Sequence, residues 1–446
     1  MSYPHRRNLR CFLDDPQVIQ EESRPYITRD HYYSSYRINE RNHMNPIHQK
    51  SLRSGYTTGT CASAAAKAAA IFLLTGKEPD SVNLKLPEGE EGIWYPKPCT
   101  DPGYEGFFQV QKDAGDDPDV TDRSWICARV SPISRPRLTE LKDSGRGYWL
   151  EDYPDLYING GTGIGIATKP GLSCPPGHYA INPVPRSMIA AAVWQTCQQA
   201  AYEGCLEVQV AIPEGQRLAE KTFNPRLGIE GGISVLGTTG IVKPMSEEAL
   251  LETIRLDIHM KGTAGEKILL LAPGNYGENF LRENMGVPLG EAVLCSNFVG
   301  DAVAMLVKEQ IRQVLFVGHI GKLVKVSAGV RNTHSRYGDG RMEQMAELLQ
   351  TAAPENAALR QAVLQCNTTE EAVSLLREAG SAEQTLNLLA ARVKAQLEEW
   401  SGGQLKAQVV TFSSAYGILG KTSQADELLT QWKRQKQQKQ HREDAN

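Results

Sequence analysis

The sequence predicts a mixed α/β protein with two domains, an N-terminal α+β domain and a C-terminal Rossmann-like parallel α/β domain. The chain has 446 residues, which exceeds one typical hydrophobic core. Short strand-like segments without regular helical alternation fill residues 51–233. Between residues 234 and 425, apolar runs alternate with helical segments. Such alternation is typical of a doubly wound parallel sheet with right-handed crossovers.

The composition excludes several classes of protein. The 48 basic and 52 acidic residues give a net charge of −4, whereas a nucleic-acid surface needs a basic excess. Nine cysteines without a Cys-x-x-Cys pair fit reduced thiols in the cytoplasm. No apolar stretch is expected to span a membrane, and the amino terminus lacks the apolar core of a signal peptide. A cytoplasmic protein that binds neither nucleic acid nor membrane is therefore expected.

Polar segments flank the two predicted domains. Residues 1–50 are rich in Arg, His and Tyr and show no clear period, so they are expected to form an N-terminal extension. Residues 426–446 are expected to be a polar C-terminal tail, in which the Lys/Gln-rich stretch 433–442 forms a frayed helix.

The first domain begins with a Gly/Thr loop and an alanine-rich helix over residues 61–74, which stops at Gly76. Thr58 or Thr60 can cap this helix. Hydroxyls and free N–H groups at a helix start also form an anion site. The residues alone favour the plain cap. Strands are expected to follow over 82–86, 107–111, 125–130 and 206–212, with a helix over 187–202.

Two loops in this domain allow more than one interpretation. Residues 112–122 carry five acids, which suggests either a self-capped Asp-Pro turn or a Mg²⁺ or Ca²⁺ site. The turn is preferred, and a cationic ligand such as a sulfonium beside Asp113 and Asp116 is a further alternative. Residues 157–165 look like a dinucleotide fingerprint. However, Pro170 follows too soon for a helix to open after them, so a glycine-rich loop is predicted.

The second domain repeats a strand followed by a polar or glycine-rich loop. Strands are expected over residues 233–236, 268–272, 292–295, 314–317 and 408–412, with a helix from Ser246 and a helical insertion over 343–400. Residues 415–422 satisfy a relaxed phosphate-loop pattern after a strand. Too few residues follow them for a helix and a Mg²⁺-binding strand, so a nucleotidase is disfavoured.

The most polar segment that follows a predicted strand is residues 318–341. Ligands of open parallel sheets bind at such strand ends. The segment holds several candidate ligand-binding side chains: His319, Lys322, Lys325, His334, Arg336, Asp339 and Arg341.

This segment and six others resemble the cobalt-precorrin-5B C1-methyltransferases, the CbiD family of anaerobic cobalamin biosynthesis. The resembling blocks occur in the family's order at residues 54–60, 112–121, 160–171, 180–186, 232–242, 273–275 and 318–341. The resemblance implies S-adenosylmethionine-dependent methylation of C1 of cobalt-precorrin-5B to give cobalt-precorrin-6A. Because cobalt arrives inside the ring, no protein metal site is implied. Thr162 stands where the family usually has an acid, so no acidic role is expected there.

The resemblance also assigns roles to residues. His334 and His319 are the candidate proton acceptors, because histidine titrates near neutral pH. Lys322, Lys325, Arg336 and Arg341 are expected to bind the carboxylate arms of the substrate. Asp339 is expected to orient the loop or these arms. Thr57, Thr58 and Thr60 are expected to contact substrate or cofactor. The cofactor is expected over Gly237, Thr238, Thr239, Gly240, Gly274, Asn275 and Gly277, where small residues allow close approach.

Two other functions stay open at this point. One is a nucleotide-binding phosphotransferase, suggested by the glycine loops, and the other is a corrinoid-binding protein without catalysis. A homo-oligomer is possible under any of the three functions.

Overall fold

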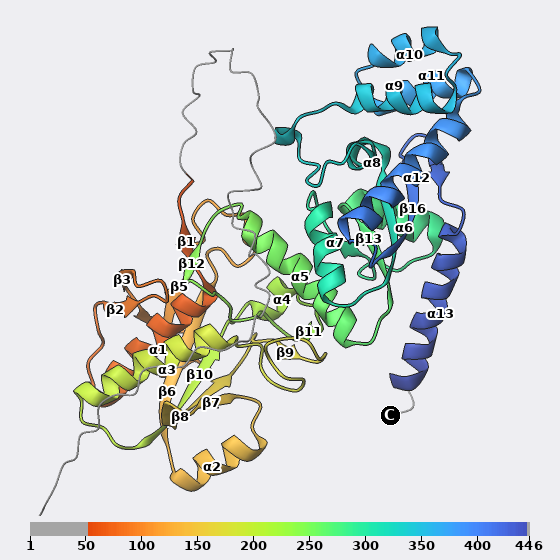
Figure 1. Ribbon diagram of the computed structural model, residues 1–446. Helices are drawn as coiled ribbons and strands as arrows, with labels where there is room; N and C mark the ends of the chain where they lie inside the picture. Colours follow the sequence, from red (N-terminus) through yellow and green to blue (C-terminus); the bar gives the residue numbers. More distant parts are fainter. Residues whose placement is uncertain (1–51, 444–446) are drawn as a thin grey trace, which may run out of the picture. The chain divides into compact units, whose positions relative to one another are not determined.

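A computed structural model describes residues 52–443, so the predicted extension over residues 1–50 lies outside the described residues. The described part is a mixed α/β protein, as predicted (Figure 1). It contains one six-stranded sheet, one five-stranded sheet and three two-stranded pairings.

The six-stranded sheet lies within the first half of the chain. Its order is β4 (Lys97–Pro98), β5 (Phe108–Gln111), β6 (Trp125–Ile133), β10 (Cys205–Ala211), β8 (Tyr153–Gly160) and β7 (Tyr148–Leu150). Only β10 and β8 pair in parallel. A separate hairpin joins β2 (Val82–Lys85) to β3 (Glu91–Trp94). These strands confirm the segments predicted from alternating apolar residues.

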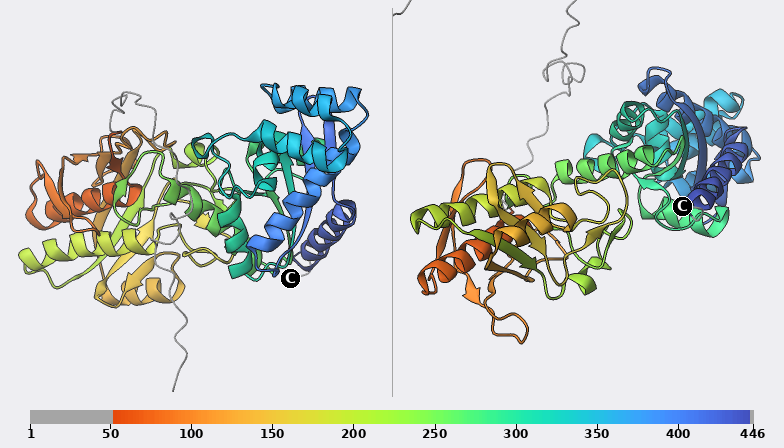
Figure 2. Two further views of the ribbon diagram at one scale, coloured as in Figure 1. Left: turned by 45° about the horizontal axis from the view of Figure 1, so that its top comes forward. Right: turned by 90° about the horizontal axis from the view of Figure 1, so that it is seen from below.

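Two long helices cover this sheet side by side, α1 (Thr58–Thr75) and α3 (Pro183–Gln199) (Figure 2). The alanines of α1 are almost completely buried, and their small side chains allow close approach. Thr57, rather than Thr58 or Thr60, caps α1, and Gly76 ends it in the left-handed region at φ 69°. Two shorter helices are α2 (Arg135–Ser144) and α4 (Gly215–Ala219).

Helix α1 corrects the expectation that no segment could span a membrane. Among residues 52–443, this helix is long and apolar enough to cross a membrane, judged by length and composition alone. However, 67% of the helix is buried inside the protein. Such burial is typical of the core helix of a folded domain.

The segment 229–242 pairs with N-terminal elements. Strand β11 (Ile229–Glu230) pairs with β9 (Ile166–Ala167), and β12 (Ile241–Val242) pairs with β1 (Gly55–Tyr56). Between them, Ile233 bridges to Ile164 and Val235 to Ile181. The expected strand 233–236 of the parallel sheet is therefore wrong. Ile233 and Val235 are buried in the N-terminal core instead, and Leu236 is exposed.

The five-stranded sheet has the order β14 (Val293–Leu294), β13 (Ile268–Ala272), β15 (Gln313–His319), β16 (Lys406–Ser413) and β17 (Gly417–Lys421). The first four strands run parallel, and β17 is antiparallel to β16. Because β13 comes first in the chain and lies between β14 and β15, the strand order reverses between β13 and β15.

Helices cover both faces of this sheet. One face carries α5 (Glu247–Thr263), α7 (Val299–Lys308), α8 (Ile320–Ser327) and α12 (Ala382–Trp400). The other carries α6 (Asn275–Met285) and α13 (Ala425–Glu443). Ser246 caps α5 as predicted. The predicted insertion forms α9 (Arg341–Ala352), α10 (Ala357–Leu364), α11 (Thr369–Glu378) and α12, after the short 3₁₀ turn η2 (Ser335–Tyr337).

The predicted polar tail is part of the core. Helix α13 buries Leu428 and Trp432 against the sheet. The Gln435 side chain also accepts a hydrogen bond from the N–H of Ile268 and donates one to the carbonyl of the same residue. The high Lys/Gln content hid a narrow apolar face, so residues 426–443 belong to the folded unit.

Candidate active site at the carboxyl edge of the parallel sheet

The strand order reverses between the carboxyl ends of β13 and β15, which is the position where open α/β sheets have a ligand crevice. After β13, Gly274 has φ 103°, and α6 begins at Asn275 without a side-chain cap. After β15, His319 ends the strand and α8 begins. Two helices therefore start at this edge, and helix starts favour anions.

Lys322 lies in this crevice. Its ammonium donates to the carbonyls of Pro273, at 3.0 Å, and Ser296, at 3.3 Å. These carbonyls follow β13 and β14. Burial lowers the pKa of Lys322. The structure thus brings Lys322 next to the predicted cofactor residues Gly274 and Asn275 at one strand edge.

His319 is held between two partners. Its Nε2 lies 3.1 Å from Oε1 of Glu370, and its Nδ1 accepts the N–H of Gly321 at 3.3 Å. These bonds place the single ring proton of the neutral imidazole on Nε2. The ring edge also meets Phe412 at 5.5 Å between centroids. Burial lowers the pKa of His319, and the Glu370 carboxylate offsets part of that shift.

Glu370 is a functional candidate that sequence reasoning missed. It lies in the first turn of α11, where an acid is usual near the positive end of a helix. Its other oxygen accepts the Thr369 hydroxyl at 3.0 Å. Only the packing of α11 against the strand edge reveals its partner, because 51 positions separate it from His319.

His334 is exposed and caps η2. Its Nδ1 accepts the backbone N–H of Arg336 at 3.2 Å, and this bond sets its tautomer. The hydroxyl of the neighbouring Thr333 donates to Oδ1 of Asn297 at 3.2 Å.

The other predicted substrate-binding charges of the segment pair with protein groups. Lys325 is buried and donates to the Gly338 carbonyl at 2.9 Å, so it anchors the loop. Arg336 pairs with Glu247 and stacks on Tyr337 at 4.8 Å. Arg341 binds Asp339 through Nη2 at 2.7 Å. Arg336 and Asp339 remain exposed.

The three predicted threonines belong to the helix scaffold. Thr57, Thr58 and Thr60 are buried. The Thr58 hydroxyl accepts the Leu236 N–H at 2.9 Å, and Thr60 donates to the Gly240 carbonyl at 2.7 Å. The Leu236 carbonyl accepts the Gly59 N–H. The hydroxyl and N–H groups that were expected to form an anion site are therefore hydrogen-bonded to other parts of the chain.

The turn Gly237–Gly240 packs on the same scaffold. Gly237 has φ 138°, and a Cβ there would lie 2.3 Å from the Thr57 hydroxyl. Thr239 caps the turn through the Ile241 carbonyl, and Thr238 is exposed. In the described residues, the hydrogen bonds of this turn stay within the N-terminal elements. The expectation that it shares one cofactor site with Gly274 is therefore not supported by these contacts.

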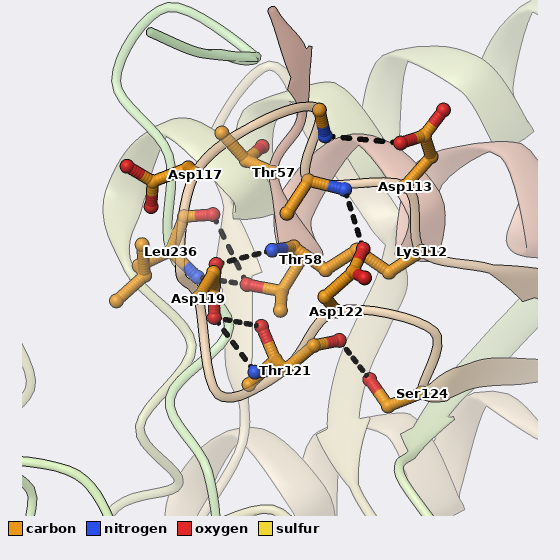
Figure 3. A network of polar contacts seen from close by, with 12 residues as sticks. Thr57, Thr58, Lys112, Asp113, Asp117, Asp119, Thr121, Asp122, Ser124 and Leu236 are labelled. Atoms are coloured by element: carbon orange, nitrogen blue, oxygen red, sulfur yellow. Dashed lines mark hydrogen bonds and ion pairs between the residues drawn. The ribbon is translucent and has the colours of Figure 1, made fainter. Parts of the chain in front are cut away.

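The acid-rich loop forms the self-capped turn that was preferred (Figure 3). Asp119 pairs with buried Lys112 and accepts two bonds from Thr121, each at 2.7 Å. Asp113 binds Arg53, and Asp122 accepts the Ala114 N–H. Arg53 thus occupies the place suggested for a cationic ligand. Among residues 52–443, no group of His, Cys, Asp and Glu is arranged to hold a metal ion.

The two segments that resemble nucleotide-binding motifs, residues 157–165 and 415–422, do not form those motifs, as predicted. Strand β8 passes through a turn into the short strand β9, so no helix follows the glycines of residues 157–165. Residues 417–421 are extended in β17, and Thr422 bonds to Gln408 and Val409. An extended strand cannot wrap phosphates, so this segment is a hairpin.

The CbiD family model matches residues 45–244, and the model of the CbiD C-terminal domain matches residues 332–423. A protein of Ruminiclostridium cellulolyticum is 38% identical over 370 residues, which is 82% of this chain and 90% of that protein. The chain belongs to the CbiD family.

Further CbiD proteins are also similar to this chain. A protein of Alkaliphilus metalliredigens is 39% identical over 385 residues, covering 85% of this chain and 95% of that protein. Both relatives are named cobalt-precorrin-5B C(1)-methyltransferase. A crystal structure of the CbiD protein of Archaeoglobus fulgidus is similar at 25% identity and a TM-score of 0.34, covering 66% of this chain and 84% of that chain. The first CbiD match ends two residues after β12.

Proposed function

We propose that this CbiD chain is a methyltransferase that uses S-adenosylmethionine to methylate C1 of cobalt-precorrin-5B, giving cobalt-precorrin-6A. The observation that carries the proposal is similarity along most of the chain to relatives with that name. The reaction forms a bond between the methyl carbon and C1 and breaks the bond from that methyl to sulfur.

The crevice fits the amino-acid end of this methyl donor. A carboxylate is favoured by the uncapped start of α6 and by the Lys322 ammonium. Gly274 presents no Cβ at the same edge. The donor supplies an electrophilic methyl group when it is bound. We therefore assign Gly274, Asn275 and Lys322 to the donor site. Gly277, which was also expected there, is buried and packs on Ala272 and Val317.

We propose His319 as the proton acceptor for the proton that the macrocycle loses, with Glu370 as its positioning residue. A carboxylate on Nε2–H stabilises the imidazolium that forms when Nδ1 gives up the bond from the Gly321 N–H and takes a proton instead. His334 is the second candidate, and its exposed ring lies on the loop with Arg336 and Asp339. Arg336 and Arg341 are suited to the carboxylate arms of the substrate.

The direct test is incubation with cobalt-precorrin-5B and methyl-labelled S-adenosylmethionine, followed by mass analysis of the corrinoid. A single added labelled methyl group supports the proposal. A folded protein that binds the corrinoid without making it heavier would instead be a carrier. Thermal protection by ATP, with none by S-adenosylmethionine, would favour a phosphotransferase.

We also propose two domains, with a boundary near residue 244. The support is that segment 229–242 pairs with N-terminal strands, while separate cores surround the two main sheets. The second domain is Rossmann-like in its strand order around β13 and β15. Limited proteolysis should first cut between β12 and α5. First cuts inside either main sheet would contradict the boundary.

A cytoplasmic location is proposed for the same chain. All eight cysteines of the described part are free thiols, as is usual in a reducing compartment. Fractionation of cells that express a tagged full-length chain tests it.

A further inference from the structure

A cavity of about 940 Å³ lies at the opposite end of β13 from the crevice. Residues 264–267, which line it, precede the strand, whereas Pro273 follows it. A five-residue strand spans about 16 Å, so the cavity and the crevice are separate sites. Residues 264–267 form one part of the cavity wall. The rest is formed by the C-terminal half of α5, the 290–291 loop, α13, Lys169, Pro170 and Arg226.

The lining is strongly cationic. It includes seven cations, Lys169, Arg226, Lys261, Lys267, Arg434, Lys436 and Lys439, against three carboxylates, Asp257, Glu266 and Glu291. The carboxylates already have cationic partners. Lys436 lies 2.5 Å from Glu266 and 2.7 Å from Glu291, and Lys261 lies 3.5 Å from Asp257.

Three of the cations are left to face a ligand. Lys169, Lys267 and Arg434 are exposed. In the part of the chain that the structure describes, none of them has a carboxylate oxygen within 4.0 Å. A concave surface lined by one sign of charge concentrates its potential and attracts ligands of the opposite sign.

We propose that this cavity binds a large polycarboxylate of the tetrapyrrole class, at a site separate from the methyl-transfer crevice. The charge requires a polyanion. The volume is near the upper end of the roughly 300–1,000 Å³ of small-molecule sites and is far larger than an inorganic anion needs. The choice of a tetrapyrrole rests on the proposed function, since such a macrocycle is the large polycarboxylate which that reaction handles.

The test uses uroporphyrin III, a tetrapyrrole with eight carboxyl groups, titrated into the full-length protein by fluorescence quenching. The double substitution Lys267→Glu, Arg434→Glu should weaken binding at least 10-fold. Within residues 52–443 neither side chain forms an ion pair, so the fold should persist, which circular dichroism checks. The control Lys77→Glu reverses an exposed charge outside the cavity and should bind like wild type.

Two results would overturn the site. One is an equal loss of affinity in the control and the double variant. The other is binding of tripolyphosphate at the cavity as tight as that of uroporphyrin III, which would identify a site for small polyanions only.

The activity assay separates this proposal from the proposed function. At saturating cobalt-precorrin-5B, the double variant should turn over like wild type. Loss of turnover would make the cavity the transfer site and end the claim of separation. Absence of methyl transfer in wild type, with cavity-dependent binding intact, would instead refute the function and leave the polycarboxylate site standing.

Discussion

At the scale of single residues, the contact with Glu370 distinguishes His319 from His334, the other candidate proton acceptor that the sequence offered. Burial and the carboxylate act on His319 in opposite directions. Because its folded pKa is lowered, His319 adds stability that is present above its unfolded pKa of about 6.5. That stability is lost as the pH falls through the lower folded value.

Glu370→Gln should lower the pKa of His319 further, because it removes the charge that raises it. Turnover should fall at least about 10-fold, since the imidazolium loses its stabilising partner. The imidazole pKa is measured by NMR titration and the turnover by mass analysis. Glu343→Gln, a first-turn acid of α9, is the matched control. An unchanged His319 pKa in Glu370→Gln would remove the positioning role.

Lys322→Met should weaken S-adenosylmethionine binding by about 10-fold, near 1.4 kcal/mol, because the cation facing the donor carboxylate is lost. Methionine keeps an unbranched stem of similar length. Isothermal titration calorimetry measures the affinity, and Lys308→Met provides an exposed control. Wild-type affinity in Lys322→Met would exclude Lys322 from the donor site.

At the scale of elements, patterns of local sequence predicted most strands and helices correctly. Alternating apolar residues identified β2, β5, β6 and β10. Gly76 identified the end of α1, and Ser246 identified the start of α5. The segment 233–236 failed, because an apolar run ending in glycine looks the same whichever sheet receives it. The role of Glu370 and the packing of α13 on the sheet were missed for a related reason: their partners are distant in sequence.

Gly237→Ala tests the packing of the 237–240 turn on α1. The new methyl group would meet Thr57 at 2.3 Å in a backbone region that disfavours side chains, so the free energy of unfolding should fall by about 2–4 kcal/mol. Gly231→Ala has φ 77° and open space, so it should lose only about 1–2 kcal/mol. Urea unfolding measures both, and equal losses would show that the contact with Thr57 is unimportant.

At the scale of the whole molecule, α13 completes the core from the far end of the chain. Trp432→Ala should lower the free energy of unfolding by about 3–5 kcal/mol, because its side chain is 2% exposed. Deleting residues 441–446 should change little, since these residues follow the buried face. Thermal and urea unfolding measure both, and a Trp432→Ala protein as stable as wild type would contradict the packing.

The two ends of the five-stranded sheet limit how this protein can associate with copies of itself. At one end β14 is only two residues long. At the other, the Lys421 N–H of β17 is taken by the Asn387 side chain of α12 at 3.1 Å. Short or covered edge strands resist the addition of a foreign strand. Strand addition to this sheet is therefore disfavoured in the native fold, and intermolecular β-sheet built on it should appear only after that fold is lost.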